Sequence, residues 1–253
     1  NKVLPSIKNN KNIKITSILT KKKNEGKLHI KNLKYFFNKN DFLKKDKSRF
    51  VYISSINSLH YQNCLDTLNQ KKNVICEKPI CLNVNQLSKL IRIAKKNKVK
   101  IFEIIQYVEH PVFKKIKNII KNKSFGKILY VESSFKVPLY KNEGFRFKAN
   151  QGGGALYDSG FYPISLIYTL FQSKKVKIIN SHITNADGID ISGGVHCYNN
   201  QGINFNLSWG FRSNYQNYIN ILCEHASISI NLFFSKRIMH DAKIIINDKK
   251  KRK

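Results

Sequence analysis

The sequence is poor in acidic residues: 15 Asp and Glu against 46 Lys and Arg give a formal net charge of +31 at pH 7. An excess of this size is compatible with nucleic-acid binding, in which basic side chains neutralise phosphates. Arginine occurs at only six positions, however, and base-reading or phosphate-clamping sites generally use its forked head group. The lysines are spread along the chain beside abundant Asn and Ile, the amino acids of A- and T-rich codons. We therefore expect weak, salt-sensitive binding to polyanions and no specific nucleic-acid partner.

Long apolar runs and paired cysteines are also missing. No stretch reaches the roughly 20 apolar residues that a membrane span requires, and no apolar segment typical of a secretory signal opens the sequence. The cysteines are five in number and none forms a CxxC pair. These features predict reduced thiols in a cytoplasmic protein that does not enter the membrane. No His, Cys and carboxylate cluster has the spacing of metal ligands, so no metal site is predicted.

Segments of strand and helix character alternate over the first hundred residues. The β-rich apolar segments predict strands over 13–20, 50–56, 73–78 and 99–105. The segments between them predict helices over 31–38, 58–71 and 84–97. Strands that alternate with helices through short connections are typical of a parallel sheet built from βαβ units.

The pattern changes after residue 106. Helices are predicted over 111–122 and 155–171. Strands that alternate apolar and polar residues are predicted over 127–137, 176–184, 190–198, 202–209, 217–224 and 226–232. Such alternation indicates a mostly antiparallel sheet with one buried face. We therefore expect an α/β domain over 1–106 and an α+β domain with a large open sheet over 107–253.

Three segments resemble the Gfo/Idh/MocA oxidoreductases in their order and spacing. In 52–90 a strand and a small-residue loop lead to Glu-Lys-Pro at 77–79. Residues 106–135 resemble the family's crossing from the nucleotide domain into the sheet domain. The third segment, 145–171, contains GGGALYDSGFYPI at 152–164. Three residues such as Glu-Lys-Pro recur by chance, whereas the glycine-rich pattern behind them is specific to this family.

The resemblance implies a Rossmann-type dinucleotide-binding domain followed by the sheet domain. It implies an NAD(P)-dependent dehydrogenase or reductase that transfers hydride between nicotinamide and a hydroxyl or ketone of a sugar or sugar nucleotide. With its tyrosine, the third segment most resembles the branch of the family that contains nucleotide-sugar 3-ketoreductases and dihydrodiol dehydrogenases. The family commonly forms homodimers or homotetramers through the sheet domain, and the apolar alternation over 203–232 permits this.

The same resemblance implies the catalytic residues. Hydride transfer to a carbonyl leaves an alkoxide that needs a proton, and Tyr162 matches the family's donor position. A free tyrosine has a pKa of about 10, and a neighbouring ammonium such as Lys78 lowers it by favouring the phenolate. Asp158 precedes Tyr162 by one helical turn, so both can face one cleft. Lys78, Arg146, Asp158 and Tyr162 are therefore expected to bind substrate. As single residues they would more simply be a surface lysine, a surface arginine, a helix cap and a core tyrosine.

Cofactor binding is expected at loops that follow the predicted strands. The residues are Thr20, Lys21, Ser54, Asn57, His60, Glu77, Lys78 and Pro79. The strand over 13–20 ends at Thr20 where related enzymes place a carboxylate on the ribose 2′-OH, and Lys21 follows. Lysines attract a 2′-phosphate, so NADP is slightly favoured over NAD.

The family's G-x-G-x-x-G/A loop, which cradles the cofactor pyrophosphate, is not found in these 253 residues. The nucleotide domain is accordingly expected to be incomplete on its N-terminal side. This leaves an alternative open: a truncated or degenerate relative without catalysis that uses the sheet domain as an interaction module.

Overall fold

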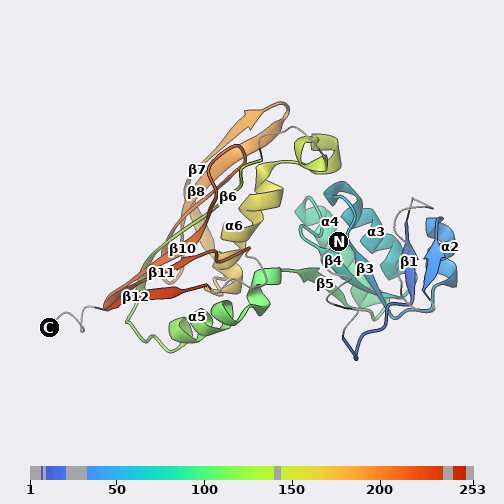
Figure 1. Cartoon of the computed structure of the whole chain (residues 1–253), viewed down its shortest axis with the longest axis horizontal. Helices are drawn as coiled ribbons and strands as arrows, with labels where there is room; N and C mark the ends of the chain where they lie inside the picture. Colours follow the sequence, from blue (N-terminus) through green and yellow to red (C-terminus); the bar gives the residue numbers. More distant parts are fainter. Residues whose placement is uncertain (1–6, 8–9, 21–32, 140–143, 236–241, 249–253) are drawn as a thin grey trace. The chain divides into compact units, whose positions relative to one another are not determined.

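The computed structural model describes residue 7 and residues 10–20, 33–139, 144–235 and 242–248. Contacts divide the chain into two units (Figure 1). The first contains residues 1–55 and 59–103, and the second contains residues 56–58 and 104–253. Within the described ranges, no helix has both the length and the apolar character needed to cross a membrane.

The first unit alternates strands and helices around two small sheets. Its elements are β1 (Ser17–Leu19), β2 (Lys34–Phe36), α2 (Lys39–Lys45), β3 (Phe50–Ile53), α3 (Asn57–Asn69), β4 (Asn73–Glu77), α4 (Val84–Lys96) and β5 (Ile101–Ile104). β1 pairs with β2 in parallel, and a second sheet has the order β3-β4-β5 with β3 and β4 parallel. Cys64, Leu68, Val74 and Leu90 are fully buried between the helices and this second sheet. The predicted α/β character of this half is confirmed.

The helix predicted over 31–38 is wrong over the residues described. Lys34–Phe36 form strand β2, which pairs with β1 in the register Ile18↔Tyr35. A helix begins only afterwards, where the Asn38 side chain accepts hydrogen bonds from two backbone N–H groups of the first turn of α2. Pairing with a distant strand therefore outweighs the local helical pattern, and the real helix begins at an asparagine cap.

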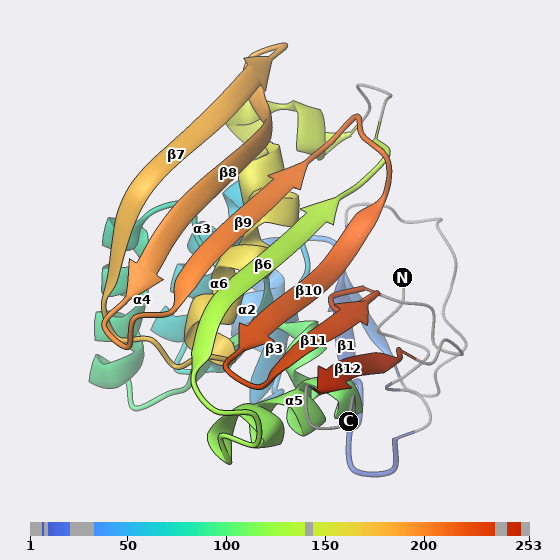
Figure 2. The ribbon, with the colours of Figure 1, turned by 90° about the vertical axis from the view of Figure 1, so that its left-hand side faces the viewer.

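The second unit is built on one large sheet. Its strands are β6 (Ile128–Lys136), β7 (Val176–Ala186), β8 (Ile189–Asn199), β9 (Asn204–Gly210), β10 (Gln216–Cys223), β11 (Ala226–Asn231) and β12 (Ile244–Asp248). Their order is β12-β11-β10-β6-β9-β8-β7, in which β6 and β9 are parallel and the other five neighbouring pairs are antiparallel. Figure 2 shows the strands side by side with α6 (Phe161–Thr169) behind them. The mostly antiparallel open sheet is thus confirmed, and β12 was not predicted.

Apolar side chains on the inner face of this sheet pack against α5 (Pro111–Lys121) and α6. The cluster includes Ile116 and Leu166 from the two helices, and Phe205, Leu207 and Ile219 from the sheet, all fully buried. The other face is rich in Ser, Asn and Tyr, as the alternating pattern predicted. The sheet therefore gives α6 a rigid base.

The region predicted as one helix over 155–171 has two parts. Residues Leu156–Gly160 form a π-helical turn, and α6 follows directly. A π-turn contains more residues than an α-turn. Asp158 lies in the π-turn and Tyr162 in α6, so the two residues are not one α-helical turn apart as predicted. Such π-turns occur frequently at functional sites.

A buried ion pair joins the two sheets of the first unit. Asp46, after α2, has a side chain that is 2% exposed and accepts from Lys72 Nζ at 2.8 Å. It also accepts from Ser17 Oγ of β1 at 2.6 Å and from Ser48 N at 3.2 Å. Burial alone would raise the pKa of Asp46, but the hydrogen bonds from Lys72, Ser17 and Ser48 outweigh it and hold the pKa below its ordinary value.

We predict that Lys72→Met lowers the free energy of unfolding by about 3 kcal/mol, because it leaves the buried Asp46 carboxylate without its counter-ion. Urea unfolding at neutral pH measures this loss. The folded pKa of Asp46 is depressed, so its contribution is present above the unfolded value and is lost as the pH falls through the folded one. The wild type should accordingly retain this stability further into acid than the variant.

A matched control is Lys45→Met, which breaks the exposed pair between Lys45 and Asp41. It should change stability by less than about 1 kcal/mol. Equal effects of the two substitutions would contradict a special role for the buried pair.

Candidate functional site

Side chains from neighbouring elements hold the Glu-Lys-Pro segment in the first unit. The Tyr52 hydroxyl of β3 donates to Glu77 Oε1 at 2.6 Å. From α3, His60 Nδ1 lies 2.7 Å from the Pro79 carbonyl oxygen and its Nε2 lies 2.8 Å from that of Ser55. Tyr52 and His60 thus fix the segment on both sides of Lys78, and the Lys78–Pro79 peptide is cis.

Strand register brings Ser54 and Lys78 to the same edge of the second sheet. β3 and β4 run in parallel with Ile53 opposite Cys76, so both strands end at this edge. Ser54 is exposed and Lys78 is half-buried. In open α/β sheets, ligands bind outside the carboxyl ends of the strands. This edge therefore presents a hydroxyl and an ammonium where a ligand is expected.

The other predicted cofactor residues differ in their surroundings. Thr20 follows β1 and its N–H donates to the Phe36 carbonyl at 3.0 Å, while Lys21 lies outside the described residues. His60 is 1% exposed, so its two nitrogens bind backbone within the protein. Asn57 is buried and its Nδ2 donates to the Gly152 carbonyl at 2.9 Å. Asn57 and His60 therefore support loops through these bonds, and their direct contact with a cofactor stays a prediction.

In the second unit, the glycine-rich segment has no room for side chains. Gly152 has φ of +74°, and a Cβ there would lie 2.8 Å from the Asn57 Cβ. A Cβ on Gly153 would lie 2.6 Å from the Arg146 carbonyl oxygen. Real Cβ atoms do not approach other atoms so closely. The neighbours that exclude side chains at these glycines are therefore groups of the protein itself.

Gly154 lies against Asp190, the residue that anchors the following helical turn. Gly154 has φ of +115°, and any Cβ would overlap the Asp190 carboxylate. That carboxylate accepts from the Leu156 N–H at 2.6 Å at the start of the π-turn. Burial raises the pKa of Asp190, and the N–H groups of Leu156 and Ala155 oppose the rise. Sequence patterns did not identify Asp190, since nothing along the chain relates it to Gly154.

Arg146 and Asp158, both predicted to bind substrate, are paired with each other. Arg146 Nε donates to Asp158 Oδ2 at 2.8 Å, with the Asp158 side chain 19% exposed. The Arg146 guanidinium also lies over the Phe145 ring at 4.8 Å. Each charge therefore orients the other.

Tyr162, the predicted proton donor, lies in the first turn of α6 among aromatic rings. Its ring centroid is 4.8 Å from that of Phe135 and 5.7 Å from that of Phe234. The Ser165 hydroxyl donates to the Tyr162 carbonyl at 2.9 Å and lies 2.7 Å from the Tyr107 hydroxyl. Packing therefore fixes the ring of Tyr162, which remains half-buried rather than enclosed.

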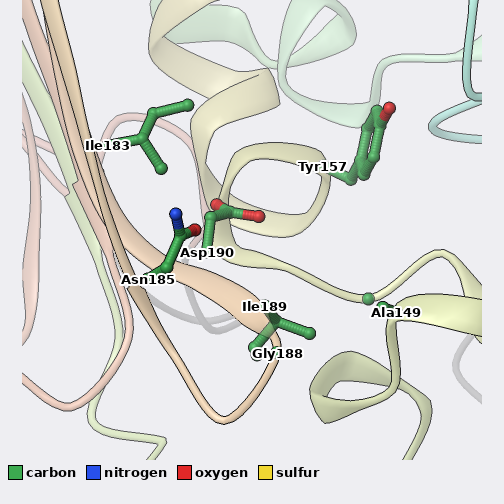
Figure 3. A pocket seen from close by; sticks show the side chains of 8 residues that line it. Ala149, Tyr157, Ile183, Asn185, Gly188, Ile189 and Asp190 are labelled. Atoms are coloured by element: carbon green, nitrogen blue, oxygen red, sulfur yellow. The ribbon is translucent and has the colours of Figure 1, made fainter.

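An open pocket of about 660 Å³ adjoins this segment in the second unit. It is lined by Ala149, Gly153, Tyr157, Ile183, Asn185, Gly188, Ile189 and Asp190. Asn185 and Asp190 are register partners on β7 and β8, and Figure 3 shows their side chains next to one another with Tyr157 across the space. The pocket thus combines apolar walls with an amide, a carboxylate and a phenol that can bind hydroxyl groups.

Comparisons with known proteins agree with the fold of both units. Residues 1–105 match the model of an oxidoreductase family with an NAD-binding Rossmann fold, and residues 113–229 match the GFO/IDH/MocA C-terminal domain. The structure of KijD10, a 3-ketoreductase from Actinomadura kijaniata in complex with NADP and TDP-benzene, superposes with a TM-score of 0.85. That match is 21% identical and covers 97% of this chain and 79% of the other, so it supports the fold.

Two curated relatives are named for different activities. Trans-1,2-dihydrobenzene-1,2-diol dehydrogenase from Xenopus laevis is 29% identical over 64% of this chain and 49% of its own length. The dTDP-3,4-didehydro-2,6-dideoxy-alpha-D-glucose 3-reductase of Actinomadura kijaniata is 25% identical over 69% of this chain and 53% of its own length. The chain therefore spans about half the length of these relatives. With both domain models matched in order, the chain belongs to the Gfo/Idh/MocA oxidoreductase family.

Proposed function

We propose that this chain carries the catalytic residues of an NAD(P)-dependent oxidoreductase acting on a hydroxyl or ketone of a sugar or sugar nucleotide. The observation that carries the proposal is the fixed position of Lys78 at the carboxyl edge of β3 and β4. Of the two curated relatives described above, one is named a diol dehydrogenase and the other a 3-reductase of a didehydro sugar nucleotide. A degenerate relative would have no reason to retain Lys78, Asp158 and Tyr162 together.

The residues at the carboxyl edge suit the ribose and nicotinamide side of a dinucleotide. Ser54 and Lys78 offer a hydroxyl and an ammonium at an exposed edge, and Glu77 is held by Tyr52. Hydroxyl and carboxylate groups of this kind bind ribose hydroxyls. Thr20 follows β1, the place at which this fold contacts the 2′ position of the cofactor ribose. Thr20, Ser54, Glu77 and Lys78 are the residues proposed to hold the cofactor, which when bound would supply or accept the hydride.

The protein's own groups would orient the substrate and move the proton. We assign Lys78 Nζ to hydrogen-bond the reacting oxygen, because an ammonium only donates and stabilises developing negative charge. Tyr162 Oη gives its proton to that oxygen in reduction and receives it in oxidation. Asp158, oriented by Arg146 at 2.8 Å, accepts from a neighbouring substrate hydroxyl.

The remote part of the substrate is assigned to the pocket beside Gly153. Its amide and phenol, from Asn185 and Tyr157, can bind hydroxyl or carbonyl groups, while Ile183 and Ile189 contact apolar surface. A volume of about 660 Å³ accommodates a group of monosaccharide size or larger. TDP-benzene in KijD10 is a ligand of that protein; for this chain it suggests nucleotide sugars as the first compounds to screen.

We predict that Lys78→Ala and Tyr162→Phe each lower kcat by roughly 10²–10⁴-fold, because each removes a group that acts on the reacting oxygen. Turnover is measured as oxidation of NADPH or NADH with a panel of keto-sugars and nucleotide sugars. Circular dichroism should show both variants folded.

The matched controls are Lys89→Ala on the exposed face of α4 and Tyr168→Phe, a tyrosine of α6 that is 58% exposed. Both should retain wild-type turnover. Near-normal activity in Lys78→Ala or Tyr162→Phe would refute the assigned roles.

We also predict a preference for NADP over NAD, because Thr20 offers no carboxylate to repel a 2′-phosphate. Thr20→Asp should reduce affinity for NADPH about tenfold or more and leave NADH binding less affected. Titration of cofactor fluorescence measures both affinities. Equal or tighter binding of NADH by the wild-type protein would contradict the preference.

We further propose a homodimer or homotetramer formed through the sheet domain. β7 is an edge strand of 11 residues that is exposed along nearly its whole length. Ile178 and Ile179 are 62% and 55% exposed there, and burying such side chains favours association.

Sedimentation velocity should therefore show an oligomer that the double substitution Ile178→Lys and Ile179→Lys weakens by at least about tenfold in Kd. Val84→Lys, at a residue of α4 that is 75% exposed, serves as the control and should leave assembly unchanged. A monomeric wild-type protein at micromolar concentration would exclude this surface as a stable interface.

A further inference from the structure

Tyr107 is a buried tyrosine in the 3-10 turn at Gln106–Glu109, and it is only 2% exposed. Neither the sequence patterns nor the family resemblance gave it a role. Its hydroxyl lies 2.7 Å from Ser165 Oγ and 2.9 Å from Thr169 Oγ1, two side chains one turn apart on α6. Tyr107 therefore contacts two successive turns of the helix that carries Tyr162.

The two hydroxyl groups on α6 donate their own protons to the helix backbone. Ser165 donates to the Tyr162 carbonyl at 2.9 Å, and Thr169 donates to the Ser165 carbonyl at 2.8 Å. A hydroxyl has one proton and two lone pairs, so both oxygens are left to accept. Tyr107 is therefore the donor to this pair, and a chain of hydrogen bonds runs from its phenol through Ser165 to the backbone of Tyr162.

The phenol of Tyr107 keeps its proton in these surroundings. Burial raises the pKa of Tyr107 above its ordinary value, and the hydroxyls of Ser165 and Thr169 oppose part of that rise. Burial also protects the hydrogen bonds from competition by water. Tyr107 can therefore donate to α6 throughout the neutral pH range.

The ring of Tyr107 belongs to the aromatic cluster around Tyr162. Its centroid lies 6.2 Å from that of Tyr162 and 5.2 Å from that of Phe234. Phe234 is in turn 5.7 Å from Tyr162. The hydroxyl and the ring of Tyr107 thus act on the same target, because one holds the backbone of Tyr162 and the other limits the movement of its side chain.

We propose that Tyr107 is a positioning residue for Tyr162: its hydroxyl clamps the start of α6 through Ser165, and its ring packs beside the Tyr162 ring. The catalytic part of this inference rests on the function proposed above, in which Tyr162 moves the proton. The structural part, the clamp on α6, stands independently of any activity. A reacting group displaced by about 1 Å can lose 10²-fold in rate, so a fixed helix start matters for a proton donor.

The substitution Tyr107→Phe tests the clamp, because it removes the hydroxyl and keeps the ring. Ser165 and Thr169 retain their carbonyl acceptors, so the variant should fold. Amide hydrogen exchange of α6, followed by NMR at Leu170 and its neighbours, measures how easily the helix opens. We expect this exchange to become about fivefold faster, which corresponds to the net loss of one hydrogen bond.

A matched variant is Tyr218→Phe on β10, in the same unit. It removes a tyrosine hydroxyl that donates to Glu132 Oε1 at 3.1 Å, away from α6. It should leave the exchange of α6 unchanged. Unchanged exchange in folded Tyr107→Phe, or an equal acceleration in Tyr218→Phe, would overturn the clamp.

Kinetics then test the catalytic part. With an active substrate, Tyr107→Phe should lower kcat about tenfold with little change in KM, because the proton donor is displaced while the groups that bind substrate remain. Tyr218→Phe should retain both constants of the wild type. A rise in KM with unchanged kcat would contradict a role through Tyr162.

A double-mutant cycle shows whether Ser165 transmits the effect. Ser165→Ala and Tyr107→Phe break the same chain of hydrogen bonds, so the double variant should have a kcat within about twofold of the slower single variant. Effects that multiply would show that the two residues act independently, and would overturn the route through Ser165.

The two readouts separate this inference from the function on which it rests. If the wild type shows no turnover while the exchange of α6 still quickens in Tyr107→Phe, the oxidoreductase proposal fails and the clamp stands. If the exchange quickens and kcat does not change, the positioning role of Tyr107 is overturned.

Discussion

The chemistry assigned to the second unit depends on a steric constraint at Gly152–Gly154. The Asn57 side chain, two backbone carbonyls and the Asp190 carboxylate occupy the positions where side chains would be, and two of the three glycines have positive φ. Because the segment passes so closely, Asp190 can reach the N–H groups that begin the π-turn. The turn then sets the rotation at which α6 begins, and with it the directions of Asp158 and Tyr162. A methyl group at Gly154 would displace the carboxylate that starts this sequence of contacts.

The first unit positions its chemistry by hydrogen bonds instead of close packing. Its key side chain, Lys78, projects from a segment that three polar groups hold from different elements. These groups are Tyr52, His60 and Glu103, the last of which accepts from the Ile80 N–H at 2.8 Å. The two units thus meet one requirement in different ways, since a reacting group misplaced by about 1 Å can lose 10²-fold in rate. Glycine packing fixes backbone direction in the second unit, whereas hydrogen bonds hold the segment that carries Lys78 in the first unit.

Patterns along the chain predicted the larger elements and failed where tertiary contacts decide. Strands such as β8 and β10 alternate along their length because one face is buried, and the alternation is visible in the sequence. β2 is too short to show a period and exists because β1 pairs with it. The family pattern predicted Arg146, Asp158 and Tyr162, but not that the first two pair. Asp190 and Glu103 are isolated carboxylates in strands, and only the fold brings them to their partners.

The buried Asp46 side chain connects β1 with the start of β4, the two strands that are followed by proposed cofactor residues. β1-β2 and β3-β4-β5 are separate sheets in the part of the chain that the structure describes. Ser17 of β1 and Lys72, immediately before β4, both bind Asp46. The Asp46 side chain therefore links β1, which is followed by Thr20, to the start of β4, which is followed by Lys78. This buried pair thus stabilises the fold between the two strands whose ends carry the proposed cofactor residues.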